Sequence, residues 1–340
     1  MLFPPGHPEG QGPRVQEGEA RRGRLDGGAA GPRPRRPGLR PSHGQGPRGL
    51  WREGGGRPLG GAAEVTRPRR IEVIPVPVRR PIEPGDDLVE ALLSACEEQG
   101  VSLRSGDVVA VASKAVSASQ GRTIRLGDLS PGELALFISR ATGLSPRFAQ
   151  AVVDEAEEIL GCVRHAALTL VSGSAVPNAG VDAKNSPPGT LTAWPRDPDG
   201  AAWEIREEIR RRAGVRVGVL IVDSGLLPLR RGTVGLAIGV AGLEPLRDYR
   251  GLTDIYGREV RITELDVADS LASAAHLAMG EGGEMVPFAV LRGAGVQLSD
   301  GFGKGDLVMD PEECAILGSL MFSTCPGPEL TRRSLSGRSP

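Results

Sequence analysis

Residues 215–224 read Val215-Arg216-Val217-Gly218-Val219-Leu220-Ile221-Val222-Asp223-Ser224, an almost uniform apolar run that ends on a carboxylate and a hydroxyl. Its length and its valine and isoleucine content are typical of a buried strand. A carboxylate at the end of such a strand is a common metal or phosphate ligand. The same Asp-Ser-Gly sequence also suits the cap of a turn or helix. The stretch therefore predicts a central strand, with Asp223 and Ser224 as candidate site residues.

Helices and strands are interspersed around this strand, which predicts an α+β fold with mixed sheets and packed helices. Polar caps, prolines and apolar periodicity predict helices over residues 86–99, 131–141, 146–160, 198–213 and 264–279. Short apolar runs predict strands over residues 71–76, 107–112, 162–171, 215–222, 233–241 and 287–291. Residues 113–122 are predicted as a polar loop, and residues 248–258 as a charged, aromatic, hairpin-like insertion.

The ends of the chain differ in composition from the rest. Residues 1–68 are dominated by Gly, Pro and Arg without apolar periodicity, so we expect a disordered tail. A basic arm for nucleic acid is one interpretation of this tail, but its composition favours a dispensable segment or translated upstream sequence. We expect a catalytic domain over residues 69–322 and a flexible tail over residues 323–340.

Charge and cysteine content limit the class of protein. The formal net charge is −1 although the tail is basic, so the folded part is acidic and we expect no nucleic acid as its partner. No apolar run reaches the length that spans a membrane, and the sequence has no secretory signal of the usual kind. The four cysteines have no metal-binding spacing, which predicts a reduced, cytoplasmic protein. Phosphate-loop and nucleophile-elbow motifs are absent, and His276 is predicted to be a core histidine.

Two further segments offer oxygen ligands. In Asn178-Ala179-Gly180-Val181-Asp182-Ala183-Lys184-Asn185, a glycine turn would place Asp182 and Asn185 on one side, although an Asx turn explains the pattern equally. Glu281 lies in a glycine-rich turn whose N–H groups could bind phosphate, although a simple helix C-cap also fits. Asp182, Asp223 and Glu281 thus supply hard donors from three segments, which suits Mg²⁺ or Mn²⁺ and a phosphate-bearing substrate. Arg230 and Arg231 are natural partners for such oxygens.

An ordered series of short motifs extends along the chain from about residue 70 to residue 295. Besides the three acidic segments, it comprises residues 74–75, 84–88, 106–109, 113–117, 121–122, 197–199, 237–242, 248–251, 254–258 and 267–269. In order and spacing, the series resembles the coenzyme F420:L-glutamate ligase family, GTP-dependent enzymes that add glutamate to a deazaflavin coenzyme precursor.

The resemblance implies a set of site residues. The implied metal ligands are Asp182, Asp223, Ser224 and Glu281, for two divalent cations. The implied catalytic residues are Asp182, Asp223 and Arg230. The implied GTP-binding residues are Arg79, Arg80, Pro81, Ile82, Ser113, Lys114, Asn185, Met279, Gly280, Glu281, Gly282, Gly283, Glu284, Met285 and Val286.

The resemblance also implies a reaction and its partners. GTP would phosphorylate a carboxylate of the precursor, and the amine of L-glutamate would attack the acyl phosphate. Mg²⁺ or Mn²⁺ is expected, and a K⁺ requirement stays open. The family implies a homodimer, in which residues 248–258 would have an interface role. We expect a ligase without a fused nitroreductase-like domain.

The chain departs from the family pattern at several positions. The family usually follows its Asp-Thr with Gly-Arg-Pro-x-Arg, whereas this chain reads Gly225-Leu226-Leu227-Pro228-Leu229-Arg230 and lacks one arginine. Ala118 stands where many relatives have lysine, Lys184 stands where acidic or small residues are common, and residues 306–320 extend beyond the usual core. These departures keep two alternatives open: another carboxylic acid acceptor, or a nucleotide-binding module without catalysis.

Overall fold

The strand predicted at residues 215–222 lies inside a five-stranded sheet. The computed structural model describes residues 70–321, and the predicted tails, 1–68 and 323–340, lie outside the described residues. The strand order is β1-β12-β2-β8-β9, in which β2 and β8 are parallel and the other neighbours are antiparallel. The strands are β1 (Glu72–Val76), β2 (Val108–Ala112), β8 (Gly218–Gly225), β9 (Val234–Ala241) and β12 (Phe288–Arg292). The first strand of the described chain thus pairs with the last, and Glu72 lies opposite Arg292.

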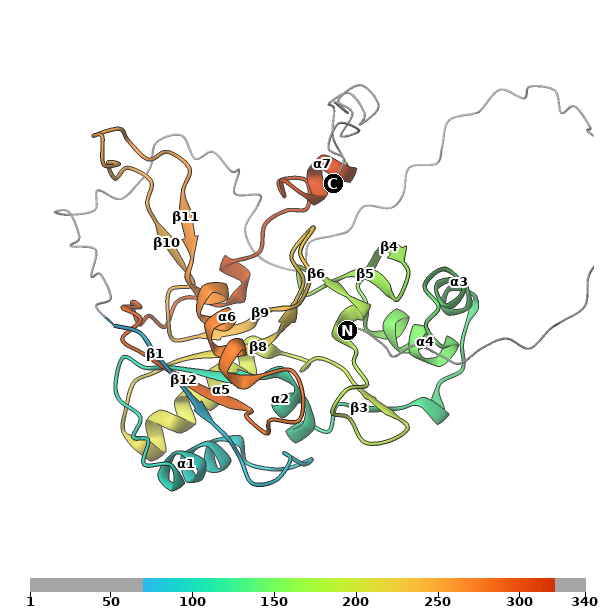
Figure 1. Ribbon diagram of the computed structural model, residues 1–340, viewed down its shortest axis with the longest axis horizontal. Helices are drawn as coiled ribbons and strands as arrows, with labels where there is room; N and C mark the ends of the chain where they lie inside the picture. Colours follow the sequence, from blue (N-terminus) through green and yellow to red (C-terminus); the bar gives the residue numbers. More distant parts are fainter. Residues whose placement is uncertain (1–69, 322–340) are drawn as a thin grey trace, which may run out of the picture. The chain divides into compact units, whose positions relative to one another are not determined.

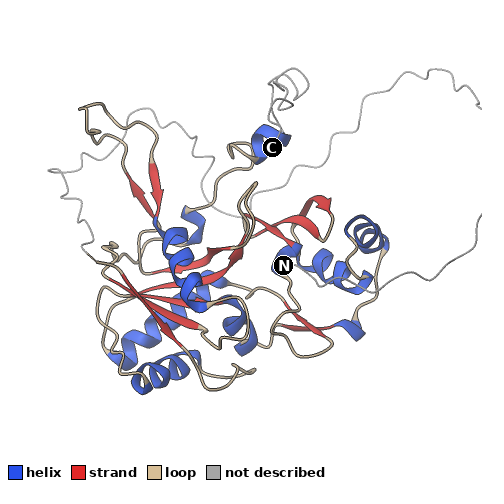
Figure 2. Cartoon of the chain, in the orientation of Figure 1, coloured by secondary structure: helices blue, strands red, loops and turns tan. Residues whose placement is uncertain are grey.

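Helices cover both faces of this sheet (Figures 1 and 2). On β2, Val109 and Val111 pack in one core with helices α1 and α5, whereas Val108 and Ala110 pack with α6. This period-two division follows from the strand geometry, in which successive side chains point to opposite faces. The helices are α1 (Leu88–Glu98), α5 (Pro198–Ala213) and α6 (Val267–Met279). The central sheet is therefore buried on both sides, as its uniformly apolar strands predict.

The helix ends follow the polar caps in the sequence. Asp87 accepts hydrogen bonds from two backbone N–H groups at the start of α1. Asp197 caps α5, which ends at Gly214 in the left-handed conformation. Asp266 caps α6, where its carboxylate accepts the N–H of Asp269. Side-chain oxygens thus satisfy N–H groups that have no partner inside the helix.

A second group of elements packs around its own core of buried alanine, valine, leucine and isoleucine side chains. It contains a three-stranded sheet, β4-β5-β6, a two-stranded sheet of β3 and β7, and the helices α3 and α4. The bounds are β3 (Thr123–Arg125), α3 (Glu133–Thr142), α4 (Pro146–Glu155), β4 (Glu158–Val163), β5 (Ala166–Val171), β6 (Ser174–Pro177) and β7 (Thr190–Thr192). Short 3₁₀ turns lie at η1 (Leu126–Asp128), η2 (Asn178–Gly180) and η3 (Lys304–Asp306). This group supplies the loop that contains Asp182.

The remaining elements are a ribbon and two short helices. β10 (Leu246–Asp248) and β11 (Glu264–Asp266) pair antiparallel at the base of a ribbon, which contains the predicted insertion at residues 248–258. The other helices are α2 (Ser113–Ser119) and α7 (Leu317–Met321). No helix in the described part of the chain is long and apolar enough to cross a membrane.

Several predicted boundaries were wrong, each for a local reason. Residues 113–119, predicted as loop, form α2, because the helix is short and its buried face consists of small residues that give no apolar stripe. The strand predicted over 162–171 is a hairpin of β4 and β5, turned at His165 with φ of 73°. The helix predicted over 146–160 ends at Glu155, since β4 begins at Glu158. The first three residues of the predicted 264–279 helix belong to β11.

Asp269 fixes α6 against the sheet. Its carboxylate accepts the backbone N–H of Ala237 on β9 at 2.8 Å. Burial raises the pKa of Asp269 to about 6, and the neighbouring Asp266 carboxylate adds to this increase, while the Ala237 N–H opposes it. Small residues allow the same close packing: a Cβ on Gly235 would lie 2.2 Å from the carbonyl oxygen of Ala272 on α6.

Candidate functional site

The Asp182 loop begins with a left-handed turn. Asn178, Ala179 and Gly180 have consecutive φ angles of 54°, 53° and 68°, a conformation that glycine accepts but other residues adopt only when held. Here the Asn178 side chain accepts the N–H of Ala167 at 2.9 Å, and the N–H of Ala179 donates to Thr169. Local side-chain contacts therefore stabilise the strained turn that presents Asp182.

Asp182 lies beside β7 and combines a structural contact with an exposed charge. Its backbone exchanges two hydrogen bonds with Thr192, and its Oδ1 accepts the N–H of Lys184 at 2.9 Å, which is an Asx turn. The other carboxylate oxygen accepts the Lys114 ammonium at 2.5 Å. One oxygen thus closes the Asx turn that the sequence allowed, and the second accepts a lysine ammonium.

Asp223 lies near the end of β8, as the apolar run predicts. One carboxylate oxygen accepts the N–H of Ser224 at 2.7 Å, and the other accepts the indole N–H of Trp194. Burial raises the pKa of Asp223, and the Asp182 charge adds to the increase, while the Ser224 and Trp194 donors and the Lys114 charge oppose it. The charges of Asp182 and Lys114 therefore act on Asp223 in opposite directions.

Glu281 follows α6 and is held by three donors. Its carboxylate accepts Lys184, the Thr233 hydroxyl at 2.6 Å and the His276 ring at 2.8 Å. Burial would raise the pKa of Glu281, but these hydrogen bonds outweigh it and lower the pKa to about 2. The prediction that His276 is only a core histidine was wrong, because its ring holds the carboxylate one turn beyond it.

The predicted nucleotide-binding segments meet through backbone and amide contacts. The N–H of Val78 donates to the carbonyl of Met285 at 2.8 Å, which brings residues 79–82 beside residues 279–286. Asn185 donates its side-chain amide to the carbonyl of Gly282 at 2.7 Å, and the N–H of Gly282 donates to Glu284. The Asp182 loop, the glycine turn and the segment after β1 are thus connected in the folded chain.

A pocket of about 320 Å³ lies beside the segment after β1, and Arg79, Arg80 and Ile82 contribute to its lining. Arg80 forms a bidentate contact with Asp86 at 2.6 and 2.9 Å, and Arg79 bonds Glu98 at 2.9 Å. Both guanidiniums therefore already have carboxylate partners on or near α1. The Arg80 side chain also bonds the carbonyl of Pro81.

Three predicted residues, Arg230, Ser113 and Met279, form no hydrogen bond or ion pair with the three carboxylates in the described part of the chain. Arg230 is exposed in the β8–β9 turn and forms no ion pair with a described residue. Leu226, Leu227 and Leu229 in the same turn are 56%, 51% and 102% exposed. Ser113 is buried at the first turn of α2, and Met279 is buried at the end of α6. These two residues shape the backbone next to Lys114 and Glu281.

The carboxylates match a divalent cation in kind but are not gathered as a ligand cluster. Carboxylate and hydroxyl oxygens are the donors that Mg²⁺ and Mn²⁺ take. Within residues 70–321, however, no group of three or more His, Cys, Asp and Glu side chains is close enough to hold a metal. The positive charges next to the carboxylates belong to Lys114 and Lys184. The donors therefore fit such a cation chemically, while lysines provide the counter-charge in this arrangement.

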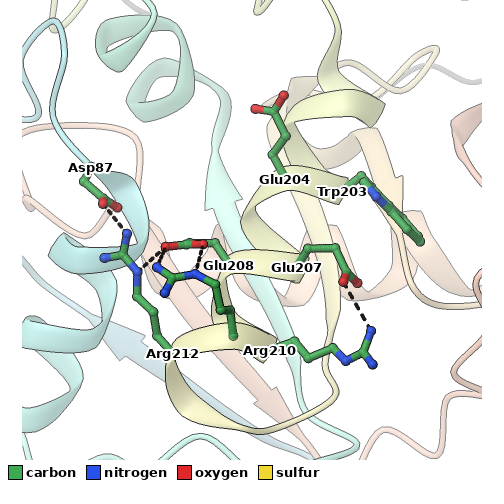
Figure 3. Close-up of a pocket in the computed structure, with 8 residues that line it drawn as sticks. Asp87, Trp203, Glu204, Glu207, Glu208, Arg210 and Arg212 are labelled. Carbon is green, nitrogen blue, oxygen red and sulfur yellow. Dashed lines mark hydrogen bonds and ion pairs between the residues drawn. The ribbon is translucent and has the colours of Figure 1, made fainter.

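A larger pocket lies elsewhere (Figure 3). It has a volume of about 810 Å³, lies over α5 and the start of α1, and contains none of the predicted site residues. Most of its charges are already paired: Arg212 contacts Asp87 and Glu208, and Arg210 contacts Glu207 at 3.3 Å. Carboxylates and guanidiniums that neutralise one another offer little to a charged ligand, so volume alone does not identify the site.

The fold and the three carboxylate segments agree with the comparison to known families. Residues 78–293 match the sequence model described as F420-0:Gamma-glutamyl ligase. The chain belongs to this family. The match includes Asp182, Asp223 and Glu281 and ends after β12, so residues 294–321 lie beyond it.

Curated relatives of this family are similar over most of their own length. The Methanopyrus kandleri protein named Coenzyme F420:L-glutamate ligase is 42% identical over 224 residues, covering 66% of this chain and 87% of the relative. The Archaeoglobus fulgidus protein of that name is 41% identical over 227 residues, covering 67% and 89%. The Methanocaldococcus jannaschii protein, also so named, is 36% identical over 250 residues, covering 73% and 98%.

Four residues that bond the carboxylates were not predicted from the sequence to do so. Trp194, Thr233 and His276 each donate to a predicted ligand, and Lys184 was noted only as a departure from the family pattern. His276 lies five residues before Glu281, which follows the end of α6, so the contact depends on the turn after the helix and not on helical spacing. Trp194 is 29 residues from Asp223 in sequence, and no local pattern connects them.

Proposed function

We propose that this chain is a GTP-dependent ligase that adds L-glutamate to the deazaflavin precursor of coenzyme F420. One observation carries the proposal: in the matched family region, Lys114 bonds both the Asp182 carboxylate and the Lys184 carbonyl, and Lys184 bonds the Glu281 carboxylate, so lysines connect two of the three candidate carboxylates. The curated relatives' printed names supply the substrate class. Such an acidic, lysine-compensated site suits a reaction in which phosphoryl charge must be neutralised.

The proposed chemistry has two displacements. A carboxylate oxygen of the precursor attacks the γ-phosphorus of GTP and GDP leaves. The amine of L-glutamate then attacks the acyl carbon and phosphate leaves, which forms the amide. Asp182, Asp223, Ser224 and Glu281 would hold the divalent cations, Mg²⁺ or Mn²⁺, whose charge would stabilise the phosphoryl oxygens.

The chain's own residues would position these groups. The Lys114 ammonium bonds both the Asp182 carboxylate and the Lys184 carbonyl, at 2.5 and 2.6 Å, so it fixes the loop and offers positive charge. His276 and Thr233 orient Glu281. Gly283 is exposed in the glycine turn after Glu281, and its backbone N–H is of the kind that can bind phosphate. Positioning and electrostatics of this kind supply much of the rate in phosphoryl transfer.

The test is GDP release by the full-length chain with GTP and Mg²⁺ or Mn²⁺, with L-glutamate and the precursor added or withheld. Release that requires both substrates supports the ligase. Asp182→Asn and Asp223→Asn are expected to lower turnover at least 100-fold, the scale of lost transition-state charge stabilisation. Glu204→Gln, on an exposed residue of the α5 pocket, is the matched control and should retain full turnover. Substantial activity in either aspartate variant would contradict the proposal.

A second acceptor is a specific alternative. The β8–β9 turn, next to Asp223, presents three exposed leucines where the family usually includes a further arginine. A more apolar or less anionic carboxylic acid would suit this turn. GDP release with another acid but not with the deazaflavin precursor would favour this alternative, whereas tight GTP binding without release under any condition would indicate a silent binding module.

We also propose a cytoplasmic homodimer. The ribbon between β10 and β11 supports the dimer, because Ile255 and Tyr256 on it are 91% and 78% exposed. Light scattering on the purified chain tests the dimer, and the Ile255→Ser variant is expected to shift it toward monomer. If the variant keeps the dimer mass of the parent chain at low micromolar concentration, the ribbon is not part of the interface.

A further inference from the structure

Lysine is rare in this chain, and its few copies are gathered in one region. Of 41 Lys and Arg residues only three are lysine: Lys114, Lys184 and Lys304. Lys114 bonds Asp182, and Lys184 bonds Glu281. An ammonium is a compact point charge that fits beside one carboxylate, whereas a guanidinium is a broad planar fork. Two of the three predicted ligand carboxylates therefore have their own lysine, and the third lysine needs an explanation.

Lys304 is buried although it forms no direct ion pair among the described residues. It is 6% exposed, and its ammonium donates to the carbonyl of Ser172 at 2.6 Å. The same ammonium lies 5.6 Å from the centre of the Trp194 ring, within the range of a cation–π contact. Burying a cation is costly, so its position next to this indole is a specific feature of the fold.

Trp194 connects Lys304 to the third carboxylate, Asp223. Its indole is 5% exposed and donates its N–H to Asp223. The edge of the ring rests on Gly180, where a Cβ would approach the indole nitrogen to 2.3 Å. The indole is thus wedged between the turn that leads to Asp182 and the carboxylate of Asp223. A cation over the ring face draws electron density from it and strengthens the N–H as a donor.

The backbone of Lys304 is held as firmly as its side chain. Its N–H is shared by the two oxygens of Asp199, each at 3.1 Å. One of these oxygens also accepts the N–H of Val240 on β9 at 2.7 Å. The segment that contains Lys304 lies beyond the family match, which ends at residue 293. A segment outside the matched region therefore reaches the site through Trp194.

We propose that Lys304 and Trp194 are a positioning pair that orients the Asp223 carboxylate, as Lys114 and Lys184 orient Asp182 and Glu281 directly. Neither residue of the pair touches the reacting atoms. The inference rests on the proposed function only in taking Asp223 as a cation ligand. Partners that orient a metal-binding side chain typically affect metal affinity 10- to 100-fold.

The variants separate positioning from general stability. Trp194→Phe keeps the aromatic ring and removes the N–H, and Lys304→Met removes the charge at similar length. Trp203→Phe is the matched control, because Trp203 also stacks with a cation, Arg206 at 4.9 Å, but lies in the α5 pocket. All variants are made in the full-length chain, and their thermal midpoints are compared first.

The first measurement is Mn²⁺ affinity by electron paramagnetic resonance, without nucleotide or acceptor. Trp194→Phe is expected to weaken Mn²⁺ binding about 10-fold or more, and Lys304→Met less, in the lower part of the range for orienting partners. Trp203→Phe should bind Mn²⁺ like the parent chain. Parent-like affinity in Trp194→Phe, with a lowered thermal midpoint alone, would show a merely structural role and overturn the proposal.

The second measurement does not depend on a bound metal or on activity. In the chain labelled with ¹⁵N-tryptophan, the indole N–H signal that disappears in Trp194→Phe belongs to Trp194. Its proton shift should move upfield in Asp223→Asn and in Lys304→Met, because a weaker hydrogen bond deshields the proton less. An unchanged shift in both variants would overturn the pair. A parent chain that binds no Mn²⁺ and releases no GDP refutes the proposed function instead, and the indole shifts then decide the pairing alone.

Discussion

Gly180→Ala tests whether Trp194 is wedged against the Asp182 loop. At this position φ is +68°, and an added Cβ would lie 2.3 Å from the indole nitrogen and 2.5 Å from two ring carbons. Left-handed backbone costs alanine about 1–2 kcal/mol, part of which the stiffer unfolded chain returns. Overpacking a buried ring adds about 1–3 kcal/mol. The total loss of unfolding free energy should therefore be about 2–4 kcal/mol.

A matched glycine isolates the steric contribution. Gly189 has φ of +75°, and a Cβ there would have no heavy atom within 4 Å. Gly189→Ala should therefore lose only the backbone contribution, about 1 kcal/mol. Urea unfolding of the full-length variants gives both values, and for a domain of this size each kcal/mol lowers the thermal midpoint by about 2–4 °C.

The double variant Gly180→Ala/Trp194→Leu completes the cycle. Removing the indole should relieve the clash, so the double variant should be more stable than the sum of the two single losses predicts, by about 1 kcal/mol or more. Equal losses in Gly180→Ala and Gly189→Ala would refute the close packing of Gly180 and Trp194.

Three further predictions concern the framework of the site. The pKa of Asp269 is raised to about 6 in the folded chain, so the native state binds more protons than the unfolded state, and the free energy of unfolding should fall as the pH rises from about 4 to 6. Asp269→Asn should remove up to about 3 kcal/mol of this fall. If urea unfolding gives the variant and the parent the same pH dependence, the prediction is contradicted. Asp107 is 2% exposed and paired with Arg292 at 2.7 Å, so Asp107→Ala should cost about 3 kcal/mol in urea unfolding, and a loss below 1 kcal/mol would show that the pair is dispensable. Gly235→Ala would place a Cβ 2.2 Å from the backbone oxygen of Ala272 and should cost about 3 kcal/mol, whereas an unchanged thermal midpoint would show that α6 can move away freely.

The central sheet could be predicted from the sequence because strands that are buried on both faces are almost uniformly apolar. β2, β8 and β12 were predicted from apolar runs, and the start of α1 was predicted from its aspartates, of which Asp87 is the cap. Elements with weak apolar periodicity were missed. β3 and β7 have three residues each, and their pairing with one another, rather than their composition, makes them strands.

In the candidate site, too, contacts between residues distant in sequence could not be predicted. Asp223 lies near the end of β8 and Glu281 just after α6, so their positions relative to these elements could be predicted from the sequence. The donors that fix the carboxylates are distant in sequence: Lys114 is 68 residues from Asp182, and Lys184 is 97 residues from Glu281. The sequence offered Arg230 as a partner for phosphate or carboxylate oxygens, and the structure places it exposed in the β8–β9 turn.

Because β1 pairs with β12, it stays unpaired during much of the synthesis of the chain. β1 is an edge strand whose only sheet neighbour in the described chain is β12. At about 5–20 residues per second, a ribosome adds the intervening segments in roughly 10–40 s, during which β1 has no partner. Pro75 lies within β1, and a proline removes one backbone donor from an otherwise adhesive edge. The nascent strand thus has a built-in protection against pairing with a neighbouring chain while it waits for its own.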